Sequence, residues 1–287
     1  MHTKAPSLFD LIPGKVLLDR YKITRSTRRD GMSTAFAVED LEEQGSREVQ
    51  VFPASLFDGR EQSVDFARAM RAWTRVVSKA VLATHAAEEF DDGTILVVTD
   101  LPPARSLRDR TKEGGPLAAG EVARIGLGLL DGLAMVHAAG LVHGDVKPQT
   151  IRLFEGQPGV VLIDGGITAA LWSAKHLGEK TALIGTPFYA PVEQFGGESP
   201  DVQSDLYNLA CVLYELATGV LPWKGRSFLD VFQEKLQKEP PAMKARAPQV
   251  DVPAALEAAI RGGLMADRRE RYGSVAPFRA ALAGAAA

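Results

Sequence analysis

The stretch His143-Gly144-Asp145-Val146-Lys147-Pro148-Gln149-Thr150 decides the fold of this chain. A histidine two residues before an aspartate is common in ordinary turns, so this stretch alone carries little weight. Its weight comes from four segments that follow it along the chain. They are Leu162-Ile163-Asp164-Gly165-Gly166, Gly185-Thr186-Pro187-Phe188-Tyr189-Ala190-Pro191-Val192-Glu193-Gln194, Ser204-Asp205-Leu206-Tyr207 with Leu216-Ala217-Thr218-Gly219, and Asp267-Arg268-Arg269-Glu270-Arg271-Tyr272.

In this order and spacing the five segments resemble the bacterial serine/threonine protein kinases of the Hanks type. The segment 143–150 looks like the catalytic loop HRDxKPxN, and Asp164, nineteen residues after Asp145, looks like the aspartate of DFG. The resemblance covers roughly residues 19–282. It implies an α+β, two-lobed protein-kinase-like fold with a small β-rich N-lobe and a larger helical C-lobe, and it implies that any nucleotide binds in the cleft.

Local sequence patterns agree with two lobes. Short runs rich in β-branched and aromatic residues predict strands at 20–23, 33–38, 48–52, 94–99, 151–154 and 160–163. Apolar residues at three- and four-residue spacing predict helices at 63–82, 117–139, 205–218, 228–237, 254–265 and 275–283. We expect an N-terminal extension at residues 1–18, an N-lobe at 19–101 and a C-lobe at 102–287, which together form a single kinase-like domain over residues 19–282.

Composition narrows the class of protein. The chain is 46% hydrophobic and 24% charged with a formal net charge of −3, which is ordinary for a globular domain. Its charges are interspersed, so no basic stripe points to a nucleic-acid partner. No apolar run is long enough to predict a membrane-spanning segment. The single cysteine, Cys211, excludes an internal disulfide and fits the reducing cytoplasm, where we expect the protein.

The glycine-rich loop of the family is degenerate in this chain. Counting from Asp30-Gly31-Met32-Ser33, the three glycines of GxGxxG fall at Arg28, Asp30 and Ser33. Those glycines let backbone N–H groups approach the phosphates closely. Side chains at these positions, one of them negative, oppose that approach. We therefore favour an ordinary β-turn over a phosphate cradle.

The lysine and adenine contacts are altered as well. The segment 47–52 aligns with the strand that reads VAIK, so the phosphate-gripping lysine becomes Phe52 and the alanine against adenine becomes Gln50. The partner glutamate on the next helix falls at Ala69. Asp100 and Leu101 align with the hinge, where Pro102 lacks an N–H for adenine. With Leu153 from the C-lobe, the resemblance gives Ser33, Gln50, Phe52, Asp100 and Leu101 as a degenerate nucleotide pocket.

In the C-lobe the resemblance implies a partly retained catalytic set. Asp145 matches the catalytic base, Lys147 the cation that offsets phosphoryl charge, and Asp164 the magnesium ligand. Thr150 replaces the asparagine of the second metal site and is at most a weak ligand. Gly144 replaces the arginine that receives an activation-loop phosphate, so we expect no switching by phosphorylation at Ser173 or Thr181.

Other matches have a structural role in the family. Asp205 matches the aspartate that holds the catalytic-loop backbone by hydrogen bonds. Glu193 and Arg271 match a buried ion pair that braces the C-lobe, and removing either partner would leave an uncompensated charge.

Three functions stay open. The first is a pseudokinase that acts as a binding or regulatory scaffold, with ATP and magnesium absent or weakly bound. Its function would then come from protein partners of unknown identity, and Trp223 is a conceivable docking residue. The second is an active but atypical serine/threonine kinase, in which Arg25, Arg28 or Arg29 replaces the missing lysine. The third is a nucleotide sensor without phosphotransfer.

Overall fold

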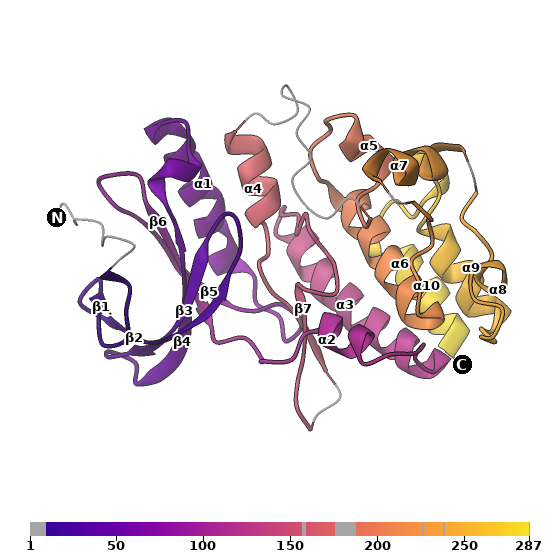
Figure 1. The fold of residues 1–287 in the computed structure, drawn as a ribbon, viewed down its shortest axis with the longest axis horizontal. Helices are drawn as coiled ribbons and strands as arrows, with labels where there is room; N and C mark the ends of the chain where they lie inside the picture. The colour runs from indigo at the N-terminus through magenta and orange to yellow at the C-terminus, as the bar shows by residue number, and fades with distance from the viewer. Residues whose placement is uncertain (1–9, 157–158, 176–187, 226, 238, 287) are drawn as a thin grey trace. The chain divides into compact units, whose positions relative to one another are not determined.

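The computed structural model describes residues 10–156, 159–175, 188–225, 227–237 and 239–286. The chain divides into two compact units. Unit 1 consists of Met1–Val77, Leu82–Pro102 and Ser173–Lys175, and unit 2 of Ser78–Val81, Pro103–Trp172 and His176–Ala287. In Figure 1 the strands of unit 1 are indigo to violet, and the helices of unit 2 run mainly from magenta to yellow.

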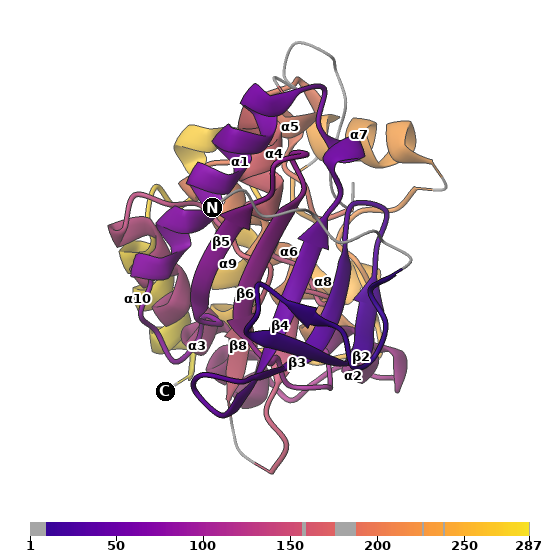
Figure 2. The same cartoon turned by 90° about the vertical axis from the view of Figure 1, so that its left-hand side faces the viewer.

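Unit 1 is built on an antiparallel sheet in the order β1-β2-β3-β4-β6-β5. Its strands are β1 (Val16–Leu17), β2 (Tyr21–Arg29), β3 (Thr34–Asp40), β4 (Gly45–Phe52), β5 (Thr84–Glu89) and β6 (Ile95–Asp100). Helix α1 (Arg60–Ala72) packs beside β5 (Figure 2). Four of these strands match predicted runs. The sequence of β5, THAAEE, is poor in β-branched residues, and β1 lies in the segment expected as an N-terminal extension.

The helix predicted over 63–82 is wrong at its C-terminal half. Helix α1 ends at Ala72, and a short 3₁₀ turn, η3 (Trp73–Arg75), follows it. Val76 then adopts an extended backbone and Val77 is 80% exposed. Adjacent β-branched residues disfavour a helix because their side chains crowd the preceding turn. Val81 instead forms a β-bridge within unit 2.

The two faces of β4 have different roles. Val49 and Val51 belong to a buried apolar cluster with Leu17, Tyr21 and Ile23. Because successive side chains on a strand point to opposite faces, the alternate residues at positions 48, 50 and 52 lie on the other face. These include the two positions at which the family has its adenine-contacting alanine and its lysine.

Unit 2 is mainly helical, with a small antiparallel sheet. Its helices pack around the almost wholly buried α6, and α3 approaches α6 and α10 closely at Gly126, where a Cβ would lie 2.5 Å from Leu282 and 2.9 Å from Leu213. The elements are α2 (Leu107–Lys112), α3 (Ala119–Ala138), β7 (Ile151–Leu153), β8 (Val160–Leu162), α4 (Ile167–Ala174), α5 (Val192–Phe195), α6 (Val202–Thr218), α7 (Phe228–Gln237), α8 (Met243–Arg246), α9 (Ala254–Gly262), η5 (Arg268–Glu270) and α10 (Val275–Ala286).

Most C-lobe predictions are confirmed at the level of elements. Helix α7 has the predicted bounds, and α3 stops before Gly140, whose φ of 73° only glycine adopts easily. The helices that the patterns missed, α2, α4, α5 and α8, have eight residues or fewer, so their apolar spacing repeats too few times to stand out from chance. None of the helices in the part of the chain that the structure describes combines the length and the apolar content needed to cross a membrane.

Candidate nucleotide and catalytic site

The lysine position of unit 1 is filled by an aromatic ring. Phe52, the last residue of β4, is fully buried. Its ring lies tilted against Phe66 of α1 with centroids 4.9 Å apart, and Phe66 also contacts Phe57 at 5.4 Å. Rings therefore connect β4 to α1 where the resemblance predicts a lysine–glutamate ion pair. Ala69, almost one turn beyond Phe66, contributes no carboxylate. This cluster offers no charge to a phosphate.

The turn between β2 and β3 is closed by its own side chains. The carboxylate of Asp30 accepts hydrogen bonds from the backbone N–H groups of Met32 (2.8 Å) and Ser33 (2.7 Å). The Ser33 hydroxyl lies 3.1 Å from the same carboxylate oxygen and accepts a 2.8 Å hydrogen bond from the amide of Gln50. Ser33 and Gln50 are both buried. Backbone N–H groups that would cradle an anion are thus bound to a carboxylate, and the chain bends at residues 31 and 32.

Arg28, at the position of the first glycine, is bound to a buried acid. Its guanidinium donates to Glu48 at 2.6 Å, and the hydroxyl of Thr27 donates to the other carboxylate oxygen at 2.8 Å. Glu48 lies on β4 and is only 1% exposed. Removing Arg28 from this pair would leave a buried carboxylate without its cation, which is costly. Three arginines are considered as a replacement for the lysine. Arg28 is held by its ion pair with Glu48, whereas Arg25 and Arg29 are exposed to solvent.

The hinge residues lie at the end of β6. The Asp100 backbone N–H donates to the Ala83 carbonyl at 3.0 Å. The Asp100 carboxylate lies 3.1 Å from Arg47 and 2.8 Å from His85. Leu101 follows as a half-buried residue outside the sheet. Asp100 is thus part of an ion-pair network of unit 1, and a role in adenine binding remains a prediction for both residues.

In unit 2 the retained catalytic residues lie on one loop. The Lys147 ammonium is 2.6 Å from the Asp145 carboxylate, and both side chains are partly exposed. The Thr150 hydroxyl donates to the Asp145 carbonyl at 2.7 Å and accepts from the Lys147 N–H at 3.1 Å. Thr150 is buried, so its hydroxyl braces the loop backbone. The structure brings these three residues together, as the resemblance implied.

Leu153 lies on β7, which follows this loop, and Asp164 lies just beyond β8, the strand paired with β7. Leu153 ends β7, half-buried, and pairs with Val160 of β8. Asp164 lies two residues after the end of β8 and has a φ of 61°. The Ile163 N–H donates to the Thr150 carbonyl at 2.9 Å, which ties this strand end to the catalytic loop.

A magnesium ion needs few protein ligands here. Magnesium is typically held by one or two carboxylates together with substrate phosphates, and Asp164 fits that part. Among the described residues no three His, Cys, Asp or Glu side chains gather around a common point. The predicted metal roles of Asp164 and Thr150 therefore stay predictions.

The structural matches of unit 2 are confirmed. The Asp205 carboxylate accepts hydrogen bonds from the backbone N–H groups of His143 (2.9 Å) and Gly144 (2.8 Å), and it also contacts His137 at 2.9 Å. Glu193 and Arg271 form a two-pronged buried ion pair at 2.7 and 2.8 Å. The Asp205 hydrogen bonds hold the backbone of the catalytic loop, and the Glu193–Arg271 pair braces the helical core. Both roles are structural.

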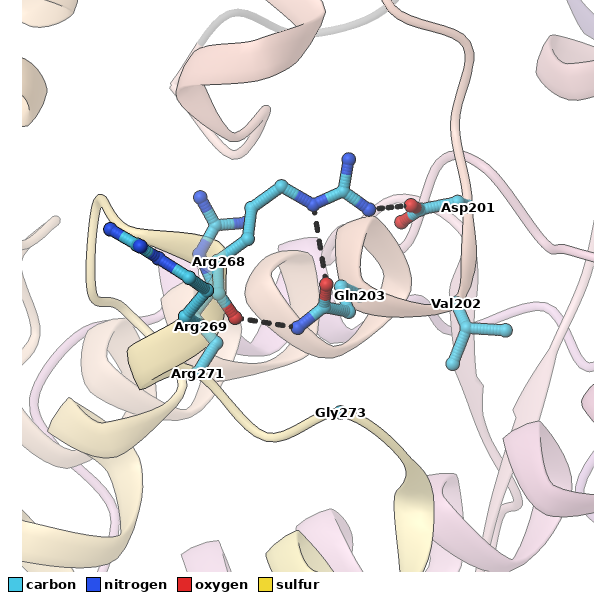
Figure 3. A pocket seen from close by; sticks show the side chains of 7 residues that line it. All are labelled: Asp201, Val202, Gln203, Arg268, Arg269, Arg271 and Gly273. Carbon is cyan, nitrogen blue, oxygen red and sulfur yellow. Dashed lines mark hydrogen bonds and ion pairs between the residues drawn. The ribbon is translucent and has the colours of Figure 1, made fainter.

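A surface pocket adjoins this ion pair (Figure 3) and is lined by Asp201, Val202, Gln203, Arg268, Arg269, Arg271 and Gly273. Figure 3 shows Arg268 reaching over Gln203 to Asp201, while Arg269 points away from them. Arg269 pairs with Asp267 at 2.5 Å. Each of the three arginines that line the pocket is therefore paired with a carboxylate among the described residues, and an anionic ligand would have to compete with that carboxylate.

Sequence reasoning missed the buried anchors of the segment 188–190. The Lys235 ammonium donates to the carbonyls of Phe188 (3.0 Å) and Ala190 (2.6 Å). The Asn208 amide donates to the Tyr189 carbonyl at 2.8 Å, and the Tyr189 hydroxyl donates to Glu215 at 2.5 Å. The sequence held one signal of this anchor. Lys235 lies one helical turn after Val231, on the apolar side of the predicted helix, where a lysine is expected to be buried and to need hydrogen-bond acceptors. The suggestion that Trp223 is a docking residue is wrong, because Trp223 is only 5% exposed.

Two expectations lie partly or wholly outside the described residues. Thr181, considered as a phosphorylation site, belongs to the stretch 176–187, and so do the first three residues of the segment 185–194.

Known proteins match both the sequence and the fold. The protein kinase domain family matches residues 61–276. A probable serine/threonine-protein kinase of Corynebacterium efficiens is 32% identical over 277 residues, which is 93% of this chain and 41% of that protein. PknB of Mycolicibacterium smegmatis is 30% identical over 270 residues, 93% of this chain and 43% of PknB. The chain thus spans less than half of the length of these two relatives.

The solved kinase domain of PknI from Mycobacterium tuberculosis superposes with a TM-score of 0.75 at 23% identity, covering 96% of this chain and 99% of that domain. This likeness confirms the predicted fold, with an antiparallel sheet in the N-lobe and a helical C-lobe. The chain therefore belongs to the protein kinase domain family, among the Hanks-type bacterial serine/threonine kinases.

Proposed function

We propose that this chain is a pseudokinase that serves as a binding or regulatory scaffold, with ATP absent or weakly bound. The observation that carries the proposal is Phe52, a fully buried ring at the lysine position that packs on Phe66. Phosphoryl transfer depends on positioned charge, and the loss of one such electrostatic contact typically lowers the rate about 100- to 1000-fold. Here the lysine and its glutamate are both replaced by apolar residues.

The polar network of the β2–β3 turn supports the same proposal. The Asp30 carboxylate accepts hydrogen bonds from two backbone N–H groups, and the Gln50 amide donates one to the Ser33 hydroxyl. These polar groups therefore have hydrogen-bond partners without a ligand. A nucleotide would have to break these hydrogen bonds and to place its phosphates beside a carboxylate. Both steps oppose binding. In unit 2 the Thr150 hydroxyl is likewise bound to its own loop.

The alternative is an active, atypical serine/threonine kinase. The 2.6 Å pair between Asp145 and Lys147 favours it, because a base and a cation are kept at the positions that the reaction needs. Asp164 keeps the carboxylate for magnesium. In this case a cation from elsewhere, such as Arg25 or Arg29, would have to meet the phosphates.

Thermal unfolding with and without ATP and magnesium separates the two functions. A pseudokinase without nucleotide binding shows no rise in its melting temperature, since a ligand stabilises a protein only when it binds the folded state. An active kinase shows a rise and transfers phosphate to a generic protein substrate. Transfer must then be lost in Asp145→Asn and kept in Asp131→Asn, which alters an exposed aspartate on α3.

Phosphate transfer with that dependence would overturn the proposal. A rise in melting temperature without transfer would reduce it to the weaker form, a nucleotide-binding scaffold. A partner protein is sought separately, by binding assays with the nucleotide-free chain.

A further inference from the structure

Helix α4 is tied to the catalytic loop by its first turn. It begins three residues after Asp164, in the part of the chain where kinases have their activation segment. The Gly166 N–H donates to the His143 carbonyl at 3.0 Å, and the Ala170 N–H donates to the Gly166 carbonyl at 2.8 Å. Ile167, Leu171 and other apolar residues of α4 are buried. The Ala170 bond belongs to the helix itself, so one backbone hydrogen bond, from Gly166 to His143, ties the start of α4 to the catalytic loop, and the apolar side chains of α4 are buried.

Gly144 lies directly against this helix. A Cβ at position 144 would lie 3.1 Å from the backbone nitrogen of Ala169 and 3.2 Å from its Cβ, with Pro200 at 3.4 Å. The φ of Gly144 is 79°, a value that residues with side chains rarely adopt. An arginine at position 144 would be strained by this backbone conformation. Its side chain would also collide with α4 in the observed position of that helix.

We propose that Gly144 fixes α4 on the catalytic loop, so that the first part of the activation segment is a permanent helix set by this glycine. The arginine of the family responds to a phosphate, whereas here the contact is built into the fold and needs no modification. The inference rests on the proposed function in that it concerns the catalytic loop of the proposed pseudokinase. The contact between Gly144 and α4 is nevertheless measured on the chain without nucleotide. The inference can therefore fail while the proposed function stands, and the reverse also holds.

Hydrogen exchange on the full chain tests this coupling. In Gly144→Ala the added methyl meets Ala169, so amides of residues 167–172 should exchange about tenfold faster or more than in the wild type. Gly140→Ala is the matched control, because Gly140 has a similar φ of 73° but nothing within 4 Å of its Cβ position. Its α4 amides should keep wild-type protection.

A second variant approaches the contact from the helix. Ala169→Leu adds bulk toward Gly144 without changing the loop, and it should loosen the same amides even if Gly144→Ala fails to fold. Wild-type protection of α4 in Ala169→Leu and in a folded Gly144→Ala would overturn the inference. Equal loosening in Gly140→Ala would also overturn it, since the effect would then come from the left-handed backbone alone.

Discussion

The ring of Phe52 on β4 packs against the ring of Phe66 on α1, with centroids 4.9 Å apart and planes inclined by 59°. This tilted pair joins the strand and the helix that an ion pair joins in the kinase family. An apolar contact of this kind stabilises the N-lobe without a ligand. It links β4 to α1 without the ion pair that the resemblance predicts there.

Truncation of this ring should destabilise the fold. Phe52→Ala is expected to lower the free energy of unfolding by about 3–5 kcal/mol, because it removes a buried ring and leaves a cavity. Urea denaturation followed by circular dichroism measures the change. The matched control is Phe52→Leu, which stays apolar and should cost less than about 1.5 kcal/mol. A loss below about 1 kcal/mol in Phe52→Ala would contradict the burial of the ring.

The buried hydrogen bond between Gln50 and Ser33 should appear as a coupling energy. Either substitution, Ser33→Ala or Gln50→Ala, removes this hydrogen bond, and the first also leaves the buried Gln50 amide without its Ser33 acceptor. The double variant should therefore cost about 1 kcal/mol less than the sum of the two. A double-mutant cycle from urea denaturation measures this difference. Gln62, a partly exposed residue of α1, serves as the control, since Gln62→Ala and Ser33→Ala should be additive within about 0.5 kcal/mol.

The arginines near the Figure 3 pocket should differ sharply in their contribution to stability. Arg271→Met strands the buried carboxylate of Glu193 and should cost about 3–5 kcal/mol. Arg269→Met removes only an exposed pair with Asp267 and should leave the unfolding midpoint close to that of the wild type. Thermal or urea unfolding of the two variants gives the comparison. Similar losses would mean that the Glu193–Arg271 pair is not buried as described.

Stability should depend on pH through Lys235. Burial lowers the pKa of this ammonium from its ordinary value to about 8. The lysine of the unfolded chain titrates near about 10.4. Between these values the unfolded chain holds one more proton than the folded chain, so the free energy of unfolding rises with pH through Lys235. The contribution is unfavourable below about pH 8 and fades above it.

The measurement compares the wild type with Lys235→Met in urea. From about pH 7.5 to about pH 9.5 the wild type should gain about 2 kcal/mol relative to the variant. Burial raises the pKa of Cys211 to about 12, which acts with the opposite sign above its usual range, and the nearby Lys235 charge partly offsets this rise. Both proteins therefore carry Cys211→Ala in the comparison. Parallel pH profiles would show that the Lys235 ammonium is solvated.

The catalytic-loop motif and its four companion segments were enough to predict the kinase fold. The places of Phe52 and Thr150 within the motifs were inferred from motif spacing and stay predictions. Local patterns erred where tertiary contacts override them. Val81 follows the helical period of α1 yet forms a bridge in unit 2, and the short helix α4 shows too few turns to reveal a period.

The sequence by itself determined which residue types stand where the resemblance expects charged groups, since residue identity is read directly from the chain. Only the tertiary structure decided what replaced them. Asp30 binds the N–H groups of its own turn, Arg28 pairs with Glu48, and Lys235 binds carbonyls 45 and 47 residues away. Such partners are chosen by which polar groups become buried together, and that depends on packing across elements that no local pattern encodes.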